Sequence, residues 1–221
     1  MIIVHHLEDS RSQRVLWLLE ELGVPYEVKR YNRDPNTSLA PPELLQVHPL
    51  GKSPVITDGD VTVAETGAIF EYLVDTYDTD ARLRPANGKH AARAYTYWLH
   101  YAEGSAMTNL LLKLVFSRLP ERAPMLMKPI VKKVSASAEQ SFIDPRIAEH
   151  TSWWNTSLAD TGYFVGNDLT AADIMMSFPL EAASSRADLA PFPHVKEFLE
   201  RIHARPAYQK ALEKGGPYAF A

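Results

Sequence analysis

One segment of the chain combines residue types that could bind both the backbone and the charged ends of a small peptide. Gly51-Lys52-Ser53-Pro54 opens a short apolar run, and a second run ends at Glu65-Thr66, directly before a helix-periodic segment. Asp58-Gly59 between the runs is a dipeptide typical of a hairpin turn. Proline cannot donate to a sheet ladder, so Pro54 belongs at the first position of a strand. A cis Ser53-Pro54 bond, which costs only about 0.5–1 kcal/mol relative to trans, would turn the backbone N–H and C=O of Ser53 outward toward an extended peptide.

A second group of reactive types lies near the N-terminus. Ser10, Arg11 and Ser12 stand where a polar loop meets the first helix-periodic segment. A hydroxyl or a guanidinium at the N-terminus of a helix could stabilise an anion there. Ser10 and Gln13 also fit the S-x-x-Q spacing of a capping box, in which Ser10 would only close the helix. From these residues alone, both interpretations stay open.

The apolar pattern around these segments predicts a βαβαββα order that ends near Tyr77. A buried strand is expected at 2–4, His5-His6-Leu7 then lead into a polar loop, and a helix from Ser10 ends at Gly23. The remaining expected elements are a strand at 26–31, a short helix starting near residue 41, the hairpin, and a helix after Thr66. Strand, helix and strand within about 30 residues predict a right-handed βαβ unit with parallel strands.

The second part of the chain has a different character. Residues 79–88 are charged, contain Pro and Gly and lack periodicity, so they predict a linker between domains. From residue 89 onward, long stretches rich in Ala, Leu, Lys and Met show no strand alternation. We therefore expect an α/β domain at 1–78, a linker at 79–88 and an all-helical domain at 89–221.

Composition excludes several classes of function. The formal net charge is −4 and the sequence pI is about 6.1, so nucleic acid is not an expected partner. The chain has no cysteine, and any thiol chemistry must therefore use a thiol of the substrate. Its histidines show no helical i, i+4 pair that would predict a metal site. No signal peptide or membrane-spanning segment is recognised, so a cytoplasmic protein with no membrane partner is expected.

Taken together, these segments resemble the cytosolic glutathione S-transferases over essentially the entire chain. The G-K-x-P segment, the hairpin and Glu65-Thr66 are similar to the glutathione-binding half of that family. Ser10 to Trp17 (SRSQRVLW) resembles serine-type bacterial and fungal members. Asn167 to Ile174 (NDLTAADI) predicts a capping box in which Thr170 caps a helix and Asp173 reaches back, and this purely structural interpretation is favoured. The segment also resembles the capping motif in the helical domain of that family. The resemblance implies a thioredoxin-like α/β domain followed by a helical bundle.

The resemblance also implies roles for single residues in binding glutathione as co-substrate. Ser10, Arg11 and Ser12, in that order, are the candidates for contact with the sulfur; no tyrosine stands at the tyrosine-type position. Lys52 is expected to meet the glycyl carboxylate and Ser53, before Pro54, the cysteinyl backbone. Glu65 is expected to pair with the γ-glutamyl ammonium, and Thr66, where many relatives have serine, with its carboxylate. His48 stands where relatives often carry asparagine, which leaves its role open.

The second substrate implied by the resemblance is a hydrophobic electrophile or an organic hydroperoxide. Tyr101, Met107 and Leu111 are candidates for lining its pocket, although such a stripe is also typical of a core. A homodimer and no metal are implied as well. The competing hypothesis is a noncatalytic binding module with the same fold, because only the Ser10 region bears on turnover.

Overall fold

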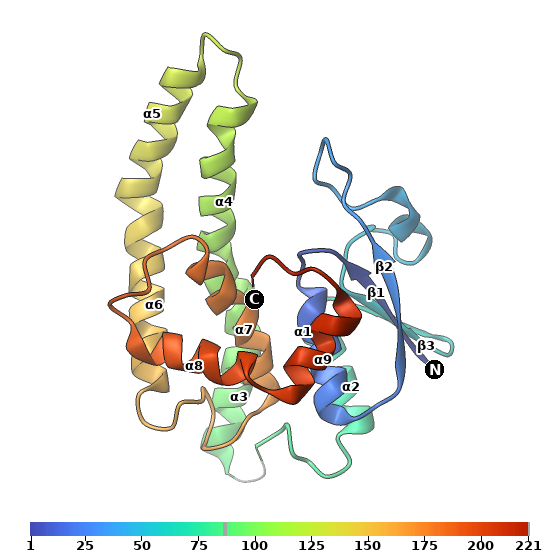
Figure 1. The fold of residues 1–221 in the computed structure, drawn as a ribbon. Coiled ribbons are helices and arrows are strands. Elements are labelled where there is room, and N and C mark those ends of the chain that lie inside the picture. Colours follow the sequence, from blue (N-terminus) through green and yellow to red (C-terminus); the bar gives the residue numbers. More distant parts are fainter. Residues whose placement is uncertain (86–87, 221) are drawn as a thin grey trace.

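A four-stranded mixed sheet stands at one side of the computed structural model, which describes residues 1–85 and 88–220, and a bundle of helices stands at the other (Figure 1). The strand order is β2-β1-β3-β4, with β1 parallel to β2 and antiparallel to β3. The strands are β1 (Ile2–Leu7), β2 (Tyr26–Tyr31), β3 (Val55–Asp58) and β4 (Val61–Ala64). The predicted βαβαββα order is confirmed.

The first strand is longer than the sequence analysis predicted. β1 continues beyond the predicted end at Val4 through His5 and His6 to Leu7, because these residues pair in register with β2 up to Tyr31. Both histidines are buried, and the Nδ1 atom of His5 lies 2.9 Å from the hydroxyl of Tyr31. The predicted strand was limited to the apolar run at 2–4, but the two histidines belong to the same central strand, where they find partners.

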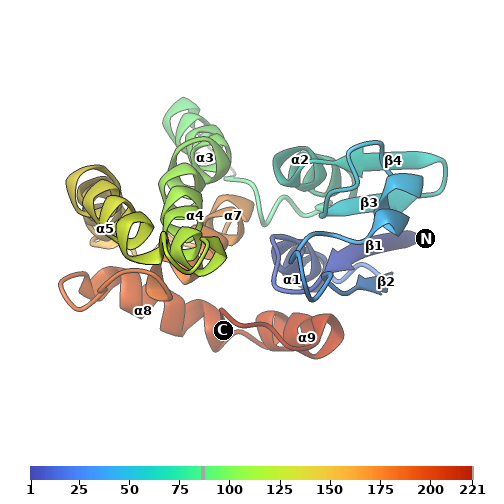
Figure 2. The same cartoon turned by 90° about the horizontal axis from the view of Figure 1, so that it is seen from above.

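Two helices of the α/β part lie between the sheet and the bundle (Figure 2). They are α1 (Ser12–Leu22) and α2 (Thr66–Tyr77). Gly23 ends α1 in the left-handed conformation, at φ 68°, as predicted. The expected short helix is a 3₁₀ helix at Pro42–Gln46, whose Leu44 packs with Leu7 and Tyr31 in a small cluster apart from the main core.

The second part of the chain is helical throughout its regular elements, as expected. The helices are α3 (Lys89–Tyr101), α4 (Met107–Arg122), α5 (Lys128–Ala138), α6 (Asp144–Leu158), α7 (Ala171–Ser184), α8 (Pro193–His203) and α9 (Pro206–Gly215). Thr170 and Asp173 form the predicted capping box at the start of α7. Two π-helical turns join successive helices, Ala102–Ala106 between α3 and α4 and Glu139–Ile143 between α5 and α6.

The predicted boundaries at 78 and 88 stay predictions. Helix α2 ends at Tyr77 and α3 begins at Lys89, but residues 86–87 of the expected linker, and residue 221, lie outside the described residues. One hydrophobic core is shared by the two parts, since α1, α2 and α7 all contribute buried side chains to it. Helix α9 returns to pack beside α1, where the ring of Tyr208 meets Trp17 edge-on at 5.3 Å. In the part of the chain that the structure describes, no helix is long and apolar enough to cross a membrane.

Candidate functional site

The sheet topology brings the candidate segments to one edge. Val55, at the start of β3, pairs with His5 near the end of β1 and with Ala64 at the end of β4. Ser53 precedes this point, Ser10 follows β1, and Glu65 follows β4. The segments that the sequence analysis singled out for the sulfur and for the peptide therefore converge, although about 40 residues separate the first from the second.

Leu7 joins two of these segments directly. Its backbone N–H donates to Ser53 Oγ at 3.2 Å, and its carbonyl accepts a hydrogen bond from Ser10 Oγ at 2.7 Å. The Ser53 hydroxyl in turn donates to the carbonyl of His5 at 2.8 Å. The loop before β3 and the start of α1 are thus held against the same backbone segment.

The loop before β3 presents backbone groups as well as side chains. The Ser53-Pro54 bond is cis and Pro54 is buried. Among residues 1–85 and 88–220, no group hydrogen-bonds to the backbone N–H or C=O of Ser53. Lys52 is exposed beside it, and His48 is half-buried with its Nδ1 accepting from the Leu50 N–H at 3.4 Å. An extended peptide could pair with this edge.

Glu65 holds an unusual backbone conformation at the start of α2. Its φ is 71° and its ψ is 126°, a region that side chains other than glycine rarely adopt, and its carboxylate is exposed. Thr66, the first helical residue, is buried. Backbone strain of this kind concentrates at binding sites, where other interactions hold it in place.

The start of α1 does not have the structure that one of the two interpretations of Ser10 requires, the capping box with Gln13. Arg11, not Ser10, is the N-terminal flanking residue of α1, and the side-chain amide of Gln13 has no hydrogen-bond partner among the described residues. The S-x-x-Q capping box is therefore not formed. Ser10 Oγ instead lies 2.7 Å from Ser12 Oγ, and Ser12 Oγ lies 2.8 Å from Nδ1 of His6. All three side chains are buried.

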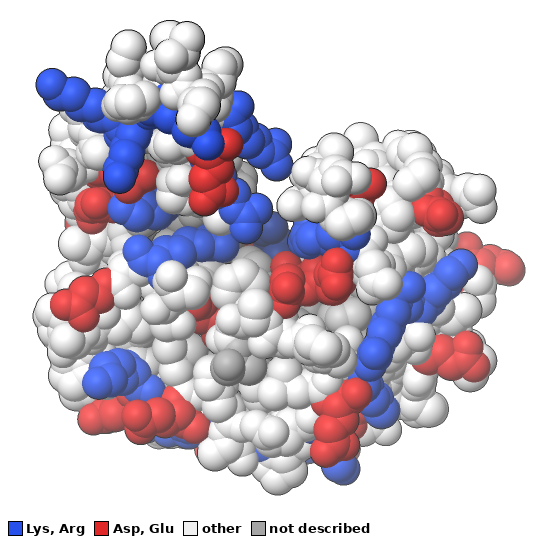
Figure 3. Space-filling model, turned by 45° about the horizontal axis from the view of Figure 1, so that its top comes forward, with Lys and Arg blue, Asp and Glu red and all other residues white. Residues whose placement is uncertain are grey.

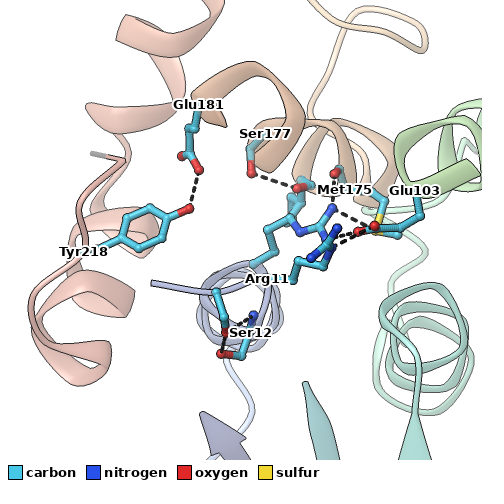
Figure 4. A network of polar contacts seen from close by, with 10 residues as sticks. Arg11, Ser12, Glu103, Met175, Ser177, Glu181 and Tyr218 are labelled. Atoms are coloured by element: carbon cyan, nitrogen blue, oxygen red, sulfur yellow. Dashed lines mark hydrogen bonds and ion pairs between the residues drawn. The ribbon is translucent and has the colours of Figure 1, made fainter. Parts of the chain in front are cut away.

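Arg11 points to a residue that the sequence analysis did not identify. Its Nε donates to Glu103 at 2.8 Å, and the buried Arg14 donates to the other oxygen of the same carboxylate (Figure 4). Burial raises the pKa of Glu103, but Arg14 and Arg11 outweigh it, so that the pKa is lowered from its usual value. Glu103 lies in the π-helical turn after α3, and no local pattern predicts that this turn would meet α1.

The C-terminal segment reaches the same region. The hydroxyl of Tyr218 donates to the buried Glu181 of α7 at 2.6 Å (Figure 4). The backbone N–H of Ala219 donates to Asp9 at 2.7 Å, one residue before Ser10. Phe220 packs edge-on against Phe178 of α7 at 5.5 Å. The tail therefore connects the loop before α1 with α7.

The candidates for the second substrate are not brought together in one exposed surface. Tyr101 is buried and its hydroxyl contacts His150 and Trp154 of α6, and Met107 is buried in the main core. Leu111, one turn farther along α4, is 48% exposed. Of the three, only Leu111 offers substantial surface in this structure. Within the described residues, no three His, Asp or Glu side chains form a group that could hold a metal ion.

Comparison with known proteins matches both parts of the chain. The model of the glutathione S-transferase N-terminal domain matches residues 1–75, and that of the C-terminal domain matches residues 122–215. Glutathione S-transferase 3 of Schizosaccharomyces pombe is 34% identical over 97% of this chain and 88% of its own length. Glutathione S-transferase 1 of Saccharomyces cerevisiae is 32% identical over 97% of this chain and 95% of its own. The crystal structure of a glutathione S-transferase from Actinobacillus pleuropneumoniae superimposes with a TM-score of 0.83 at 37% identity, covering 100% of this chain and 95% of that one.

Proposed function

This chain belongs to the glutathione S-transferase family, and we propose that it is a serine-type member in which the Ser10 hydroxyl stabilises the thiolate of glutathione. Membership of this family supports glutathione conjugation in general, with glutathione as the co-substrate. The proposed reaction is attack of the thiolate on a hydrophobic electrophile, or reduction of an organic hydroperoxide. The observation that carries the proposal is the pair of hydrogen bonds from Leu7 to Ser53 and from Ser10 to Leu7.

Activation of the thiol sets an energetic requirement. A free thiol has a pKa of about 8.5, and lowering it by two units takes about 2.7 kcal/mol of preferential stabilisation of the thiolate. A hydroxyl donor and the positive end of α1 can together supply a stabilisation of this magnitude. Ser12 is fully buried, and Arg11 is already paired with Glu103. These contacts favour Ser10 over Ser12 and Arg11 as the residue that contacts the sulfur.

The rest of the tripeptide is assigned by the groups at the converging edge. In this proposal the backbone of Ser53, set by Pro54, pairs with the cysteinyl residue, and Lys52 meets the glycyl carboxylate. The Glu65 carboxylate binds the γ-glutamyl ammonium, and Thr66 with the N-terminus of α2 binds the γ-glutamyl carboxylate. His48 is left as a candidate contact at the glycyl end. The exposed carboxylate and strained backbone of Glu65 support this arrangement.

A noncatalytic glutathione-binding module remains the second candidate, and one observation favours it. The Ser10 hydroxyl is buried and already bonded to Leu7 and near Ser12, so it must be released to reach a sulfur. Calorimetric titration with glutathione, followed by conjugation and peroxidase assays on the same sample, separates the candidates. Binding with turnover that falls in Ser10→Ala supports the serine-type enzyme. Binding without turnover supports the module, and no binding at millimolar glutathione contradicts both.

We also propose that the enzyme is a homodimer that uses the exposed face of α4 and α5. Val115, Ile130 and Val134 on these helices are 47%, 58% and 62% exposed, which is unusual for large apolar side chains. Lys and Arg side chains surround the uncharged end of the α4–α5 helix pair (Figure 3). Light scattering should report a dimer for the parent and for Thr108→Glu, a polar exposed control, and a monomer for Val134→Glu. A dimer that survives Val134→Glu would contradict the use of this face.

A further inference from the structure

A continuous line of polar side chains leads from Ser10 into the interior of the protein. Ser10 Oγ lies 2.7 Å from Ser12 Oγ, which lies 2.8 Å from Nδ1 of His6. All three side chains are at least 94% buried, at 6%, 0% and 2% exposure. The carbonyl of Leu7 is a second acceptor for the Ser10 proton, at 2.7 Å. Each neighbour is close enough for a hydrogen bond whose direction depends on where the protons lie.

The surroundings of His6 determine that direction. Burial, and then the charge of Arg30, lower the pKa of His6 to about 4, so the ring is neutral near pH 7 and carries one N–H. The backbone carbonyl of Gly215 also faces the ring, and a carbonyl can only accept a hydrogen bond. Because Nδ1 faces Ser12, we assign this N–H to Nε2, so that Nδ1 accepts from the Ser12 hydroxyl. Ser12 then has no proton left for Ser10, and its oxygen is an acceptor for the Ser10 hydroxyl.

We propose that Ser12 and His6 form a relay that removes the thiol proton of glutathione through Ser10 and then supports the thiolate that is left. The proposal rests on thiolate stabilisation by Ser10. Neither Ser12 nor His6 touches the sulfur, so both act as positioning residues for Ser10.

The proton balance of the step is complete without any other group. The S–H bond of glutathione breaks and its proton passes to Ser10 Oγ, while the Ser10 proton passes to Ser12 and the Ser12 proton to Nδ1 of His6. His6 then loses its Nε2 proton to solvent. Both hydroxyls and the imidazole end neutral, and one proton has left the site.

The same step reverses the direction of every hydrogen bond in the line. His6 now carries its proton on Nδ1 and donates to Ser12, Ser12 donates to Ser10, and Ser10 donates to the thiolate. Aligned donors polarise one another, so the line supports the sulfur more strongly than Ser10 alone. One change of tautomer thus converts a path that accepts the proton into a path that stabilises the product.

The far side of His6 offers an exit. A cavity of about 180 Å³ is lined by His6, Glu8, Asp9, Arg30 and Gly215, among others, and is large enough for several water molecules. Its two carboxylates can accept a proton that leaves Nε2. Because the pKa of His6 is low, its imidazole does not retain an extra proton near pH 7 and can pass it on.

Rapid mixing of the protein with glutathione at pH 7, followed by ultraviolet absorbance of the thiolate, tests the relay. Ser12→Ala and His6→Gln should slow thiolate formation by about ten-fold or more and raise the pKa of the bound thiol. Ser12→Thr, which keeps the hydroxyl, should restore the parent rate. His5→Gln is the matched control, because His5 is the neighbouring buried histidine of β1 but bonds to Tyr31 instead.

The outcomes separate this proposal from the proposed function. Parent-like thiolate formation in Ser12→Ala and His6→Gln, with loss only in Ser10→Ala, would overturn the relay and leave Ser10 in place. Parent-like behaviour of Ser10→Ala would overturn both. Rates in mixtures of light and heavy water on the unaltered protein provide a test that needs no variant: a curved dependence on the deuterium fraction supports several protons in flight, and a straight line contradicts it.

Discussion

Arg14 of α1 is buried, and its guanidinium donates to the carboxylate of Glu103 in the helical part of the chain. The side chain of Arg14 is 1% exposed and that of Glu103 is 32% exposed, so the pair is only partly screened by water. Arg11 shares the same carboxylate at 2.8 Å. Glu103 therefore connects the helix that follows the proposed catalytic Ser10 to the helices that pack against it.

Glu103→Ala should lower the free energy of unfolding by about 3 kcal/mol or more, because it leaves the buried charge of Arg14 without a counterion. Urea denaturation measures the change. The control is Asp75→Ala, which removes the ion pair with Arg84, whose side chains are 60% and 43% exposed. An exposed pair contributes little, so this variant should stay within about 1 kcal/mol of the parent. Equal effects of the two variants would contradict the structural role of Glu103.

His6 should make the protein sensitive to mild acid. Burial and Arg30 lower its pKa to about 4 in the folded state, against 6.5 as the ordinary value. Above pH 6.5 neither state binds the proton. As pH falls from 6.5 toward 4, the unfolded state takes it up first, so the free energy of unfolding falls by up to about 3 kcal/mol.

Urea denaturation between pH 7 and pH 4.5 tests this dependence on His6. His6→Gln should flatten the loss of stability over that range, whatever its effect at pH 7. His90→Gln, at an exposed position of α3, should keep the slope of the parent. Other groups that titrate in this range, Asp173 among them, are common to all three proteins and cancel in the comparison. Identical slopes for the parent and His6→Gln would show that His6 does not titrate as described.

The capping box of α7 should contribute more to the stability of the protein than an ordinary helix cap does. Asp173 is fully buried and accepts from the Phe164 N–H at 2.7 Å, the Thr170 N–H at 2.8 Å and the Thr170 hydroxyl at 2.7 Å. Asp173→Ala leaves these donors unpaired and should cost about 3 kcal/mol or more, and Thr170→Ala about 1 kcal/mol. Thr96→Ala at an exposed position of α3, where the hydroxyl only bonds back to Ala92, should be nearly neutral. A melting temperature for Asp173→Ala as high as that of Thr96→Ala would exclude the special role of the box.

The sequence predicted features that depend on interactions between neighbouring residues and missed those that depend on residues far apart in the chain. Gly23, the Asp58-Gly59 turn and the Thr170–Asp173 box depend on neighbours within a few residues, so their patterns predicted the local structure. The strand beyond Val4 was missed because the pairing of His5 and His6 with β2 depends on residues more than 20 positions away. Glu103 was missed for the same reason, since its partners Arg11 and Arg14 are 92 and 89 positions distant.

The local signal at Ser10 was ambiguous in a different way. The spacing of Ser10 and Gln13 fits a cap, but the buried Gln13 amide does not reach back. What selects the observed arrangement is His6, which accepts from Ser12 and lies on a strand that was predicted to have ended. Only the assembled sheet places that imidazole beside the start of α1.

Substitutions of Glu65 should affect the stability of the protein and its affinity for glutathione differently. At φ 71° and ψ 126°, glycine is far less strained than glutamate, so Glu65→Gly should raise the free energy of unfolding by about 1 kcal/mol. The same change removes the carboxylate and should weaken glutathione binding by about 2 kcal/mol or more, if that group pairs with the γ-glutamyl ammonium as proposed. Glu65→Ala should lose the same affinity without the gain in stability, because alanine keeps the strain.

Ala81→Gly is the matched control: Ala81 also has a positive φ, of 52°, but lies beyond α2 in an exposed segment. It should gain stability and bind glutathione like the parent. Calorimetry and urea denaturation on the four proteins decide the matter, and a Glu65→Gly variant that binds glutathione with unchanged affinity would remove Glu65 from the proposed site.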